Sequence, residues 1–149
     1  MDKIDFLLKK NNLNISCVES CSSGLLSSKL TSLTGSSKYF IGSFVLYNDY
    51  IKSEILNIDV NYIKKYNSVS KEICYLMAKK GKDIFNSDIC ISITGNHEAN
   101  ENSEVFIGIN FNEVNIYRYK LNGRNRNENR TIIINQVIKL LFELLKKLP

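Results

Sequence analysis

Two serines in a turn and a lysine after a strand are the residues of this sequence best suited to covalent chemistry. Ser36 and Ser37 follow Gly35 in a tight turn, where a hydroxyl can be exposed as a nucleophile if a base lies nearby. Lys52 follows the apolar stretch 44–47, which has the pattern of a strand, and burial there could remove its charge and make it a base. Each residue taken alone is more often a solvated side chain, so the case for a catalytic role depends on the neighbouring motifs.

Further polar segments lie where strands are expected to end. Glu19–Gly24 joins a strand to a helix, and such a junction offers free backbone N–H groups to an anion, although a simple helix cap is the commoner role. Thr94 and Gly95 end the most apolar strand, beyond which ligands collect in open α/β sheets. Arg126 precedes the last helix, and arginine is well suited to clamping a phosphate.

Charge and composition say little about a macromolecular partner. The net charge is +5 and the pI is about 9.0, but lysines spread along the whole chain account for most of the 20 basic residues. This balance favours an anionic small molecule over a cationic one. Nucleic-acid binding through Arg118, Arg124, Arg126 and Arg130 ranks last, because only composition supports it.

The sequence predicts neither a metal nor a membrane segment. The four cysteines have no CxxC spacing, and His97, the one histidine, lies in a polar loop and is interpreted as solvated. No apolar run approaches the roughly 20 residues of a membrane-spanning helix. The charged N-terminus lacks the apolar stretch of a secretory signal, so we expect a cytoplasmic protein.

These segments must be positioned by alternating helices and strands. The pattern predicts helices over 2–10, from 25 to Leu33, over 70–85 with Ile73, Met77 and Ile84 on the inner side, and over 128–147. It predicts strands over 14–18, 44–47, 88–93, 104–111 and 114–121, the last two as a hairpin. The simplest architecture is one α/β domain, 1–149, forming a three-layer α/β/α sandwich with a mixed, mostly parallel sheet.

The order and spacing of the motifs resemble the C-terminal domain of the competence/damage-inducible CinA family. Glu19–Gly24 is similar to the family's E-S-C-T-G-G, and Gly35-Ser36-Ser37 with Phe40 is similar to its G-S-S-x-x-F. Tyr47 and Lys52 match a tyrosine and a lysine at the same separation. Thr94-Gly95 and then Arg126 follow in the family's order, so that the resemblance covers nearly the whole chain.

The resemblance implies an α/β/α fold and a nicotinamide-nucleotide amidohydrolase, which converts nicotinamide mononucleotide to nicotinate mononucleotide and ammonia without a cofactor. It implies that Ser37 is the nucleophile and Lys52 the base, with Ser20 and Tyr47 in support. Substrate-binding roles fall to the remaining motif residues, which are Ser22, Ser36, Thr94, Gly95 and Arg126. It also favours a homo-oligomer.

Two departures from the family pattern keep a second reading open. The glycine-rich loop that follows Thr94-Gly95 in the family is here shorter and rich in asparagine, from Asn96 to Asn102. Ser23 stands where the family has a glycine, which would leave more room for a close ligand. The alternative is therefore a nucleotide-binding or regulatory module on the same fold with impaired turnover.

Overall fold

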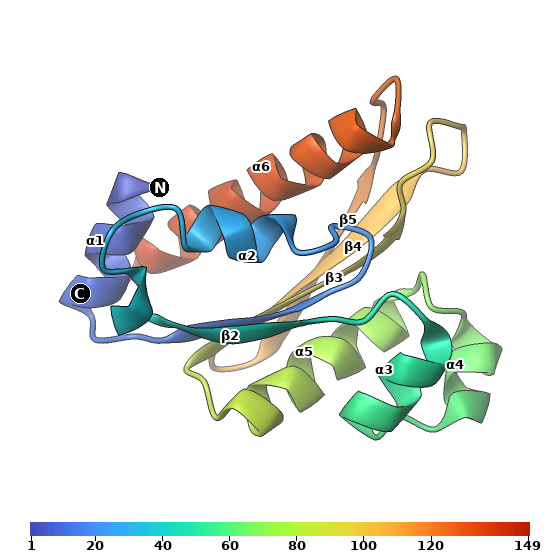
Figure 1. The fold of residues 1–149 in the computed structure, drawn as a ribbon, viewed down its shortest axis with the longest axis horizontal. Coiled ribbons are helices and arrows are strands. Elements are labelled where there is room, and N and C mark those ends of the chain that lie inside the picture. Colours follow the sequence, from blue (N-terminus) through green and yellow to red (C-terminus); the bar gives the residue numbers. More distant parts are fainter.

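A five-stranded sheet lies between two layers of helices (Figure 1). The computed structural model describes all residues, 1–149. The elements, in chain order, are α1 (Asp2–Lys10), β1 (Ile15–Glu19), α2 (Leu25–Leu30), the short 3-10 helix η1 (Ser36–Lys38), β2 (Phe40–Val45), α3 (Asp49–Leu56), α4 (Val60–Tyr66), α5 (Lys71–Phe85), β3 (Ile89–Asn96), β4 (Glu104–Asn110), β5 (Val114–Lys120) and α6 (Arg126–Leu145).

The strand order is β2-β1-β3-β4-β5. Strand β1 pairs in parallel with both β2 and β3, while β4 and β5 form an antiparallel hairpin added beside β3. The expected α/β/α layers and the mixed sheet are therefore confirmed, with parallel pairing confined to β2, β1 and β3. The carboxyl ends of these three strands meet at one edge of the sheet, at Glu19, Val45 and Asn96.

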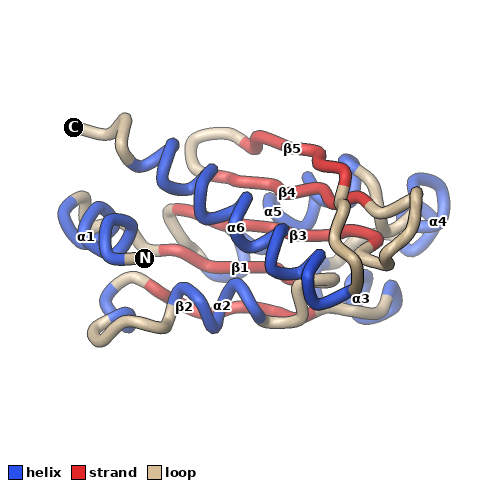
Figure 2. Tube along the Cα trace, turned by 90° about the horizontal axis from the view of Figure 1, so that it is seen from above, coloured by secondary structure: helices blue, strands red, loops and turns tan.

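Each face of the sheet has its own apolar core. Ile89, Ile91 and Ile93 of β3 point to the core under α1, α2 and α6. Cys90 alternates with them and joins Val18 in the second core, beneath α3, α4 and α5. Figure 2 shows α2 and α6 in front of the strands with α1 at their end, and α5 behind the strands. Because side chains on a strand alternate between faces and both faces are covered, β1 and β3 are buried at nearly every position.

Helix α5 begins at its predicted cap, but one of the three residues predicted on its inner side is exposed. The Ser70 hydroxyl accepts a hydrogen bond from the Ile73 amide at 3.2 Å, and Ile73 and Met77 are buried. Ile84 was predicted on the inner side and is instead 49% exposed. Phe85 takes the inner position and stacks on Phe44 of β2, with ring centroids 4.6 Å apart.

Helix α2 is shorter than expected and ends at Leu30, so Leu33 lies in the turn beyond it. The Thr31 hydroxyl donates to the Ser27 carbonyl and the Ser32 hydroxyl donates to the Lys29 carbonyl, both at 2.8 Å. Such side-chain bonds compete with the helical pattern and favour its termination.

The helices also bear on membrane topology: none of them combines the length and the apolar character that crossing a bilayer requires.

The first prediction concerns Gly81, where α5 lies closest to the sheet. A Cβ atom there would lie 2.4 Å from Val18 Cγ2 and 2.9 Å from Cys90 Sγ. We expect Gly81→Val to lower the free energy of unfolding by about 2 kcal/mol or more, because the helix must move outward or the core must rearrange. The matched control is Lys79→Val on the exposed side of α5, which should cost less than about 1 kcal/mol. Equal unfolding midpoints in urea for the two variants would contradict this account of the packing.

Candidate active site

A polar cavity of about 340 Å³ opens at the edge where the three parallel strands end. Its walls come from five segments of chain, and its lining residues are Ser20, Cys21, Tyr47, Asp49, Lys52, Ser68, Val69, Thr94, Gly95, Asn96, His97, Glu98 and Arg126. The expected site residues Ser20, Tyr47, Lys52, Thr94, Gly95 and Arg126 thus share one cavity. This placement follows from the sheet, because ligands of open α/β folds bind beyond the carboxyl ends of the strands.

Lys52 is the one buried lysine in the core of the site, with only 2% of its surface exposed. Its ammonium lies 3.5 Å from Asp49 Oδ1 and 3.4 Å from Ser68 Oγ. Burial lowers the pKa of Lys52, and the Asp49 carboxylate only partly opposes that shift. A lysine with few partners and a lowered pKa is better suited than an ordinary lysine to act as a base.

The carboxylate of Glu19 shapes the turn that carries Ser20. Fully buried, it accepts hydrogen bonds from the Gly24, Leu26 and Ser27 amides at 2.8–3.1 Å. It also accepts from the hydroxyls of Ser22 at 2.7 Å and Ser27 at 2.5 Å. These donors are the free N–H groups at the start of α2, so Glu19 occupies the position where an anionic ligand was expected.

Ser22 is therefore corrected from a substrate-binding residue to a structural one. Its side chain is buried, donates to Glu19 and does not line the cavity. The neighbouring Ser23 adopts a positive φ of 54°, so a serine accepts the backbone conformation that glycine favours. Its hydroxyl accepts a hydrogen bond from Arg130 Nη2 at 3.1 Å, and Arg130 Nε donates to the Cys21 carbonyl at the same distance.

Thr94 and Gly95 form the floor of the cavity. The Thr94 hydroxyl donates to the Ser68 carbonyl at 2.7 Å and so ties the loop before α5 to β3. The Ser68 hydroxyl in turn donates to Asp49. Gly95 has no room for a side chain, since a Cβ atom would lie 2.6 Å from the Glu104 carbonyl oxygen of β4. Its requirement for glycine thus comes from close strand packing.

Arg126 joins the two sides of the cavity mouth. Its Nη2 donates to the Tyr47 hydroxyl at 2.7 Å, its Nε donates to His97 Nε2 at 3.1 Å, and its Nη1 lies 2.8 Å from Glu98 Oε1. His97 is therefore buried and accepts a hydrogen bond, which corrects its interpretation as a solvated loop residue. Burial lowers the pKa of His97, and the positive charges of Arg126 and Arg130 lower it further.

The loop from Asn96 to Asn102 is held by asparagine side chains. Asn96 Oδ1 accepts from the Glu98 amide at 3.2 Å, and Asn100 Oδ1 accepts from the Asn102 amide at 2.9 Å. The buried Asn129 of α6 donates to the carbonyls of His97 and Glu98. No residue from 96 to 102 has a positive φ, so this loop does not need the glycines that the family has there.

Ser36 and Ser37 lie away from this cavity. They belong to η1, before β2 begins, whereas Lys52 follows β2 on α3. The six residues of β2 span about 20 Å at roughly 3.3 Å per residue, so Ser37 and Lys52 lie beyond opposite ends of this strand. The expected contact between Ser37 and Lys52 is therefore absent within one chain. Ser37 is exposed, and the Ser36 hydroxyl bonds to the Thr31 carbonyl at 3.4 Å.

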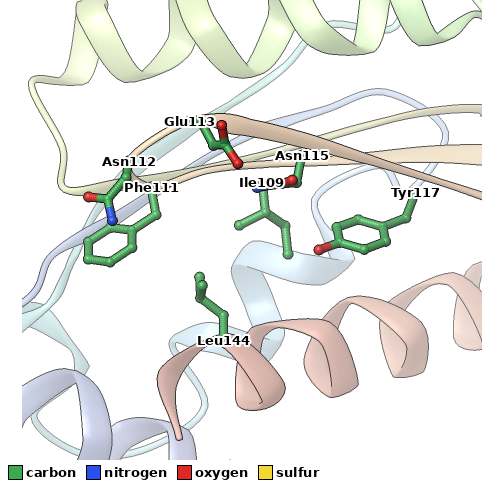
Figure 3. A pocket seen from close by; sticks show the side chains of 7 residues that line it. All are labelled: Ile109, Phe111, Asn112, Glu113, Asn115, Tyr117 and Leu144. Atoms are coloured by element: carbon green, nitrogen blue, oxygen red, sulfur yellow. The ribbon is translucent and has the colours of Figure 1, made fainter. Parts of the chain in front are cut away.

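A second cavity, of about 300 Å³, lies between the β4–β5 hairpin and the end of α6 (Figure 3). It is lined by Ile109, Phe111, Asn112, Glu113, Asn115, Tyr117 and Leu144, none of them an expected site residue.

No three His, Cys, Asp or Glu side chains gather as metal ligands would. All four cysteines are buried, and burial raises the pKa of Cys21, the one beside Lys52, to about 12. The Cys21 thiol therefore stays protonated and is a poor nucleophile.

Residues 1–145 match the family model described as the CinA C-terminal domain. This chain belongs to the CinA C-terminal domain family. A relative named CinA-like protein, from Prochlorococcus marinus strain MIT 9215, is 38% identical over 90% of this chain and 34% of its own length. A protein named putative competence-damage inducible protein, from Halothermothrix orenii, is 32% identical over 97% of this chain and 37% of its own length. The chain thus spans about a third of the curated relatives it matches.

Solved CinA superfamily structures share the fold. A protein from Klebsiella pneumoniae 700603 has a TM-score of 0.89 at 18% identity, covering 98% of this chain and 95% of its own. A competence or damage-inducible protein from Enterobacter asburiae has a TM-score of 0.89 at 22% identity, covering 97% of this chain and 94% of its own. Agreement over nearly the full length at such low identity shows that the α/β/α arrangement is the family's fold.

Sequence reasoning missed several residues of the cavity, namely Asp49, Ser68, His97 and Glu98. Asp49 lies in the first turn of α3, after Asn48, whose side chain caps that helix. His97 and Glu98 follow the carboxyl end of β3, so the rule that located Thr94 and Gly95 would have included them. Ser68 comes from a loop between two helices and had no signal of its own.

The second prediction uses His97, the single histidine, as a reporter of the cavity. Replacing Arg126 by glutamine removes a positive charge that lowers the pKa of His97, so that pKa should rise toward its ordinary value of about 6.5. A pH titration of the imidazole signals by NMR measures it. The control Arg124→Gln alters an exposed arginine paired with Glu128 and should leave the His97 titration unchanged. A titration identical in wild type and Arg126→Gln would show that the Arg126–His97 contact does not persist in solution.

Proposed function

We propose that this domain hydrolyses the carboxamide of a nicotinamide nucleotide, converting nicotinamide mononucleotide and water to nicotinate mononucleotide and ammonia. The observation that carries the proposal is the buried Lys52, whose pKa is lowered in a polar cavity that also holds hydroxyl groups and an arginine. Amides resist direct attack by water, and a covalent acyl-serine would divide the reaction into two easier steps. The family relationship supports this class of site without naming the reaction.

The chemistry begins with neutral Lys52. As a serine Oγ attacks the carboxamide carbon, its proton passes to Lys52 Nζ, and the carbonyl oxygen becomes an oxyanion that needs hydrogen-bond donors. The C–N bond then breaks, and the proton moves from Lys52 to the departing nitrogen, which leaves as ammonia. A water molecule then attacks the acyl-serine and gives a proton to Lys52, which passes it to the serine Oγ as the ester C–O bond breaks. The carboxylic acid product loses its remaining proton to solvent and leaves as the carboxylate.

The charges around the cavity suit an anionic nucleotide. Arg126 lies at the mouth, and its partner Glu98 is half exposed, so a phosphate could replace that carboxylate on the guanidinium. Tyr47 and His97 hold the remaining guanidinium nitrogens and would keep Arg126 aimed at the cavity. Ser20 and Thr94 carry hydroxyls and line the same cavity as Lys52.

The second candidate is a nucleotide-binding module with impaired turnover. It is favoured by one specific observation: Ser37 and Lys52 lie beyond opposite ends of strand β2 and are therefore separated. It predicts tight binding of a pyridine nucleotide with no release of ammonia.

Ammonia release from nicotinamide mononucleotide tests the proposal, and this is the third prediction. Purified protein should release ammonia, and Lys52→Met should reduce the rate about 100-fold or more, because the base is removed while the side-chain volume is kept. The control Lys79→Met changes an exposed lysine of α5 and should retain full activity. Binding measured by calorimetry without any ammonia from wild type would favour the binding module. An active Lys52→Met protein would remove Lys52 from the mechanism.

The pH dependence of the rate provides the fourth prediction. Because Lys52 acts as a base only when deprotonated, kcat/KM should rise with pH through the pKa of Lys52, at a midpoint below the ordinary lysine value of about 10.4. The Asp49 carboxylate raises the pKa of Lys52, so Asp49→Asn should move this rise to lower pH. Asp59→Asn, at the cap of α4, alters a carboxylate outside the cavity and serves as the control. A rise that stays in place in Asp49→Asn would mean that another group controls it.

A further inference from the structure

Ser68 shares the carboxylate of Asp49 with Lys52. The Ser68 hydroxyl donates a hydrogen bond to Asp49 Oδ1, and the Lys52 ammonium lies 3.5 Å from the same oxygen. Lys52 Nζ also lies 3.4 Å from Ser68 Oγ, so the three polar groups form a triangle. Close pairs of an ammonium and a carboxylate are about 2.7–2.9 Å apart, so the ion pair between Lys52 and Asp49 is a loose one.

The backbone around Ser68 is fixed by bonds that do not use the Ser68 side chain. The Thr94 hydroxyl of β3 donates to the Ser68 carbonyl at 2.7 Å. The Ser70 hydroxyl donates to the Asn67 carbonyl at 2.8 Å and caps the start of α5. The loop therefore presents the Ser68 hydroxyl to Asp49 without depending on that contact for its own shape.

Asp49 is free to approach Lys52 if its bond to Ser68 is lost. Its side chain is 55% exposed, and both of its side-chain contacts use Oδ1. Asp49 and Lys52 lie three positions apart on α3, a spacing at which side chains on a helix meet. A carboxylate released by Ser68 would turn toward the buried ammonium, and closer pairing stabilises the charged form of a lysine.

The Asp49 carboxylate is the neighbour with the largest influence on the charge of Lys52. Burial lowers the pKa of Lys52, and Asp49 opposes that shift most, followed by Cys21 of the turn after β1. The Cys21 thiol has a pKa of about 12 and stays neutral. The other titratable or charged side chains that line the cavity come from the segment before α3, the loop after β3 and the start of α6, and they are Tyr47, His97, Glu98 and Arg126. Ser68 therefore bonds to the one carboxylate that most favours the charged form of Lys52.

We propose that Ser68 is a positioning residue of the active site, whose hydroxyl holds the Asp49 carboxylate out of a close ion pair with Lys52. A carboxylate three residues before the base would otherwise keep that base in its charged form. Ser68 thus acts on the reaction through Asp49 and Lys52, without touching the substrate. The inference rests on the proposed amidohydrolase function only where a rate is concerned, because the proton equilibrium of Lys52 can be measured without substrate.

A titration of Lys52 in the protein without substrate tests the role of Ser68 directly. In NMR spectra of protein with isotopically labelled lysine, the Lys52 signal is the one lost in Lys52→Arg, and its dependence on pH gives the pKa. We expect Ser68→Ala to raise the pKa of Lys52 by about half a pH unit or more, because Asp49 moves closer. Asp49→Asn should lower the pKa of Lys52, and the double variant Asp49→Asn/Ser68→Ala should match Asp49→Asn alone.

Two further variants serve as controls for this titration. Ser68→Thr keeps the hydroxyl, and its Lys52 should titrate as in wild type. Ser53→Ala, also on α3, removes a hydroxyl that bonds to the Ile58 carbonyl outside the cavity, and should leave the pKa of Lys52 unchanged. An unchanged or lower pKa of Lys52 in Ser68→Ala would overturn the inference. An equal effect of Ser68→Ala in the Asp49→Asn background would also overturn it, because Ser68 would then act without Asp49.

The rate of ammonia release separates this inference from the proposed function. If Lys52 is the base, the rise of kcat/KM with pH should move upward in Ser68→Ala by the same amount as the titration. Below the midpoint, a shift of about half a pH unit lowers the rate roughly threefold. The expected order of Lys52 titrations with no ammonia from wild type would reject the amidohydrolase and retain the role of Ser68. Ammonia release by wild type, with a Lys52 titration that Ser68→Ala does not move, would retain the function and overturn the role of Ser68.

Discussion

The buried carboxylate of Glu19 is the interaction on which the site depends. It lies at the end of β1 and satisfies the amides at the start of α2, so one side chain fixes both where the strand ends and where the helix begins. Through Ser27 it is also connected to Ser43 of β2, since the Ser27 hydroxyl lies 2.5 Å from Glu19 and 2.7 Å from Ser43. A buried charge of this kind is tolerated only when its hydrogen bonds are complete, as they are here. The position of Ser20, which lines the same cavity as Lys52, follows from this arrangement.

The electrostatics of the cavity divide into an inner and an outer part. Inside, Lys52 is buried with one carboxylate at the limit of hydrogen-bonding distance, so its charge is poorly compensated and its pKa falls. Outside, Arg126 is held by three side chains from two other segments and keeps its charge at the entrance. A cation that can become neutral thus lies beneath one that cannot, an arrangement suited to binding an anion and transferring a proton beneath it.

The fold could be predicted from the sequence more fully than the site. Continuous apolar runs identified the buried strands, and Ser70 identified the start of α5, because these signals are local. The cavity residues after β1, β2 and β3 were also predictable, since parallel strands end at a common edge. The relation of Ser37 to Lys52 was not, because motif order does not show that a strand lies between them and separates them. His97 was misjudged because its burial depends on Arg126 and Asn129 of α6, which are distant in sequence.

The asparagine-rich loop after Gly95 has a consequence for how the protein responds to acid and base. Its turns are closed by the amide groups of Asn96, Asn100 and Asn129, none of which gains or loses a proton between acid and alkaline solution. These asparagine hydrogen bonds are therefore the same whether Lys52 and His97 are charged or neutral. A change in the charge of Lys52 or His97 thus alters the electrostatics of the cavity without removing the amide hydrogen bonds that hold the loop beside it.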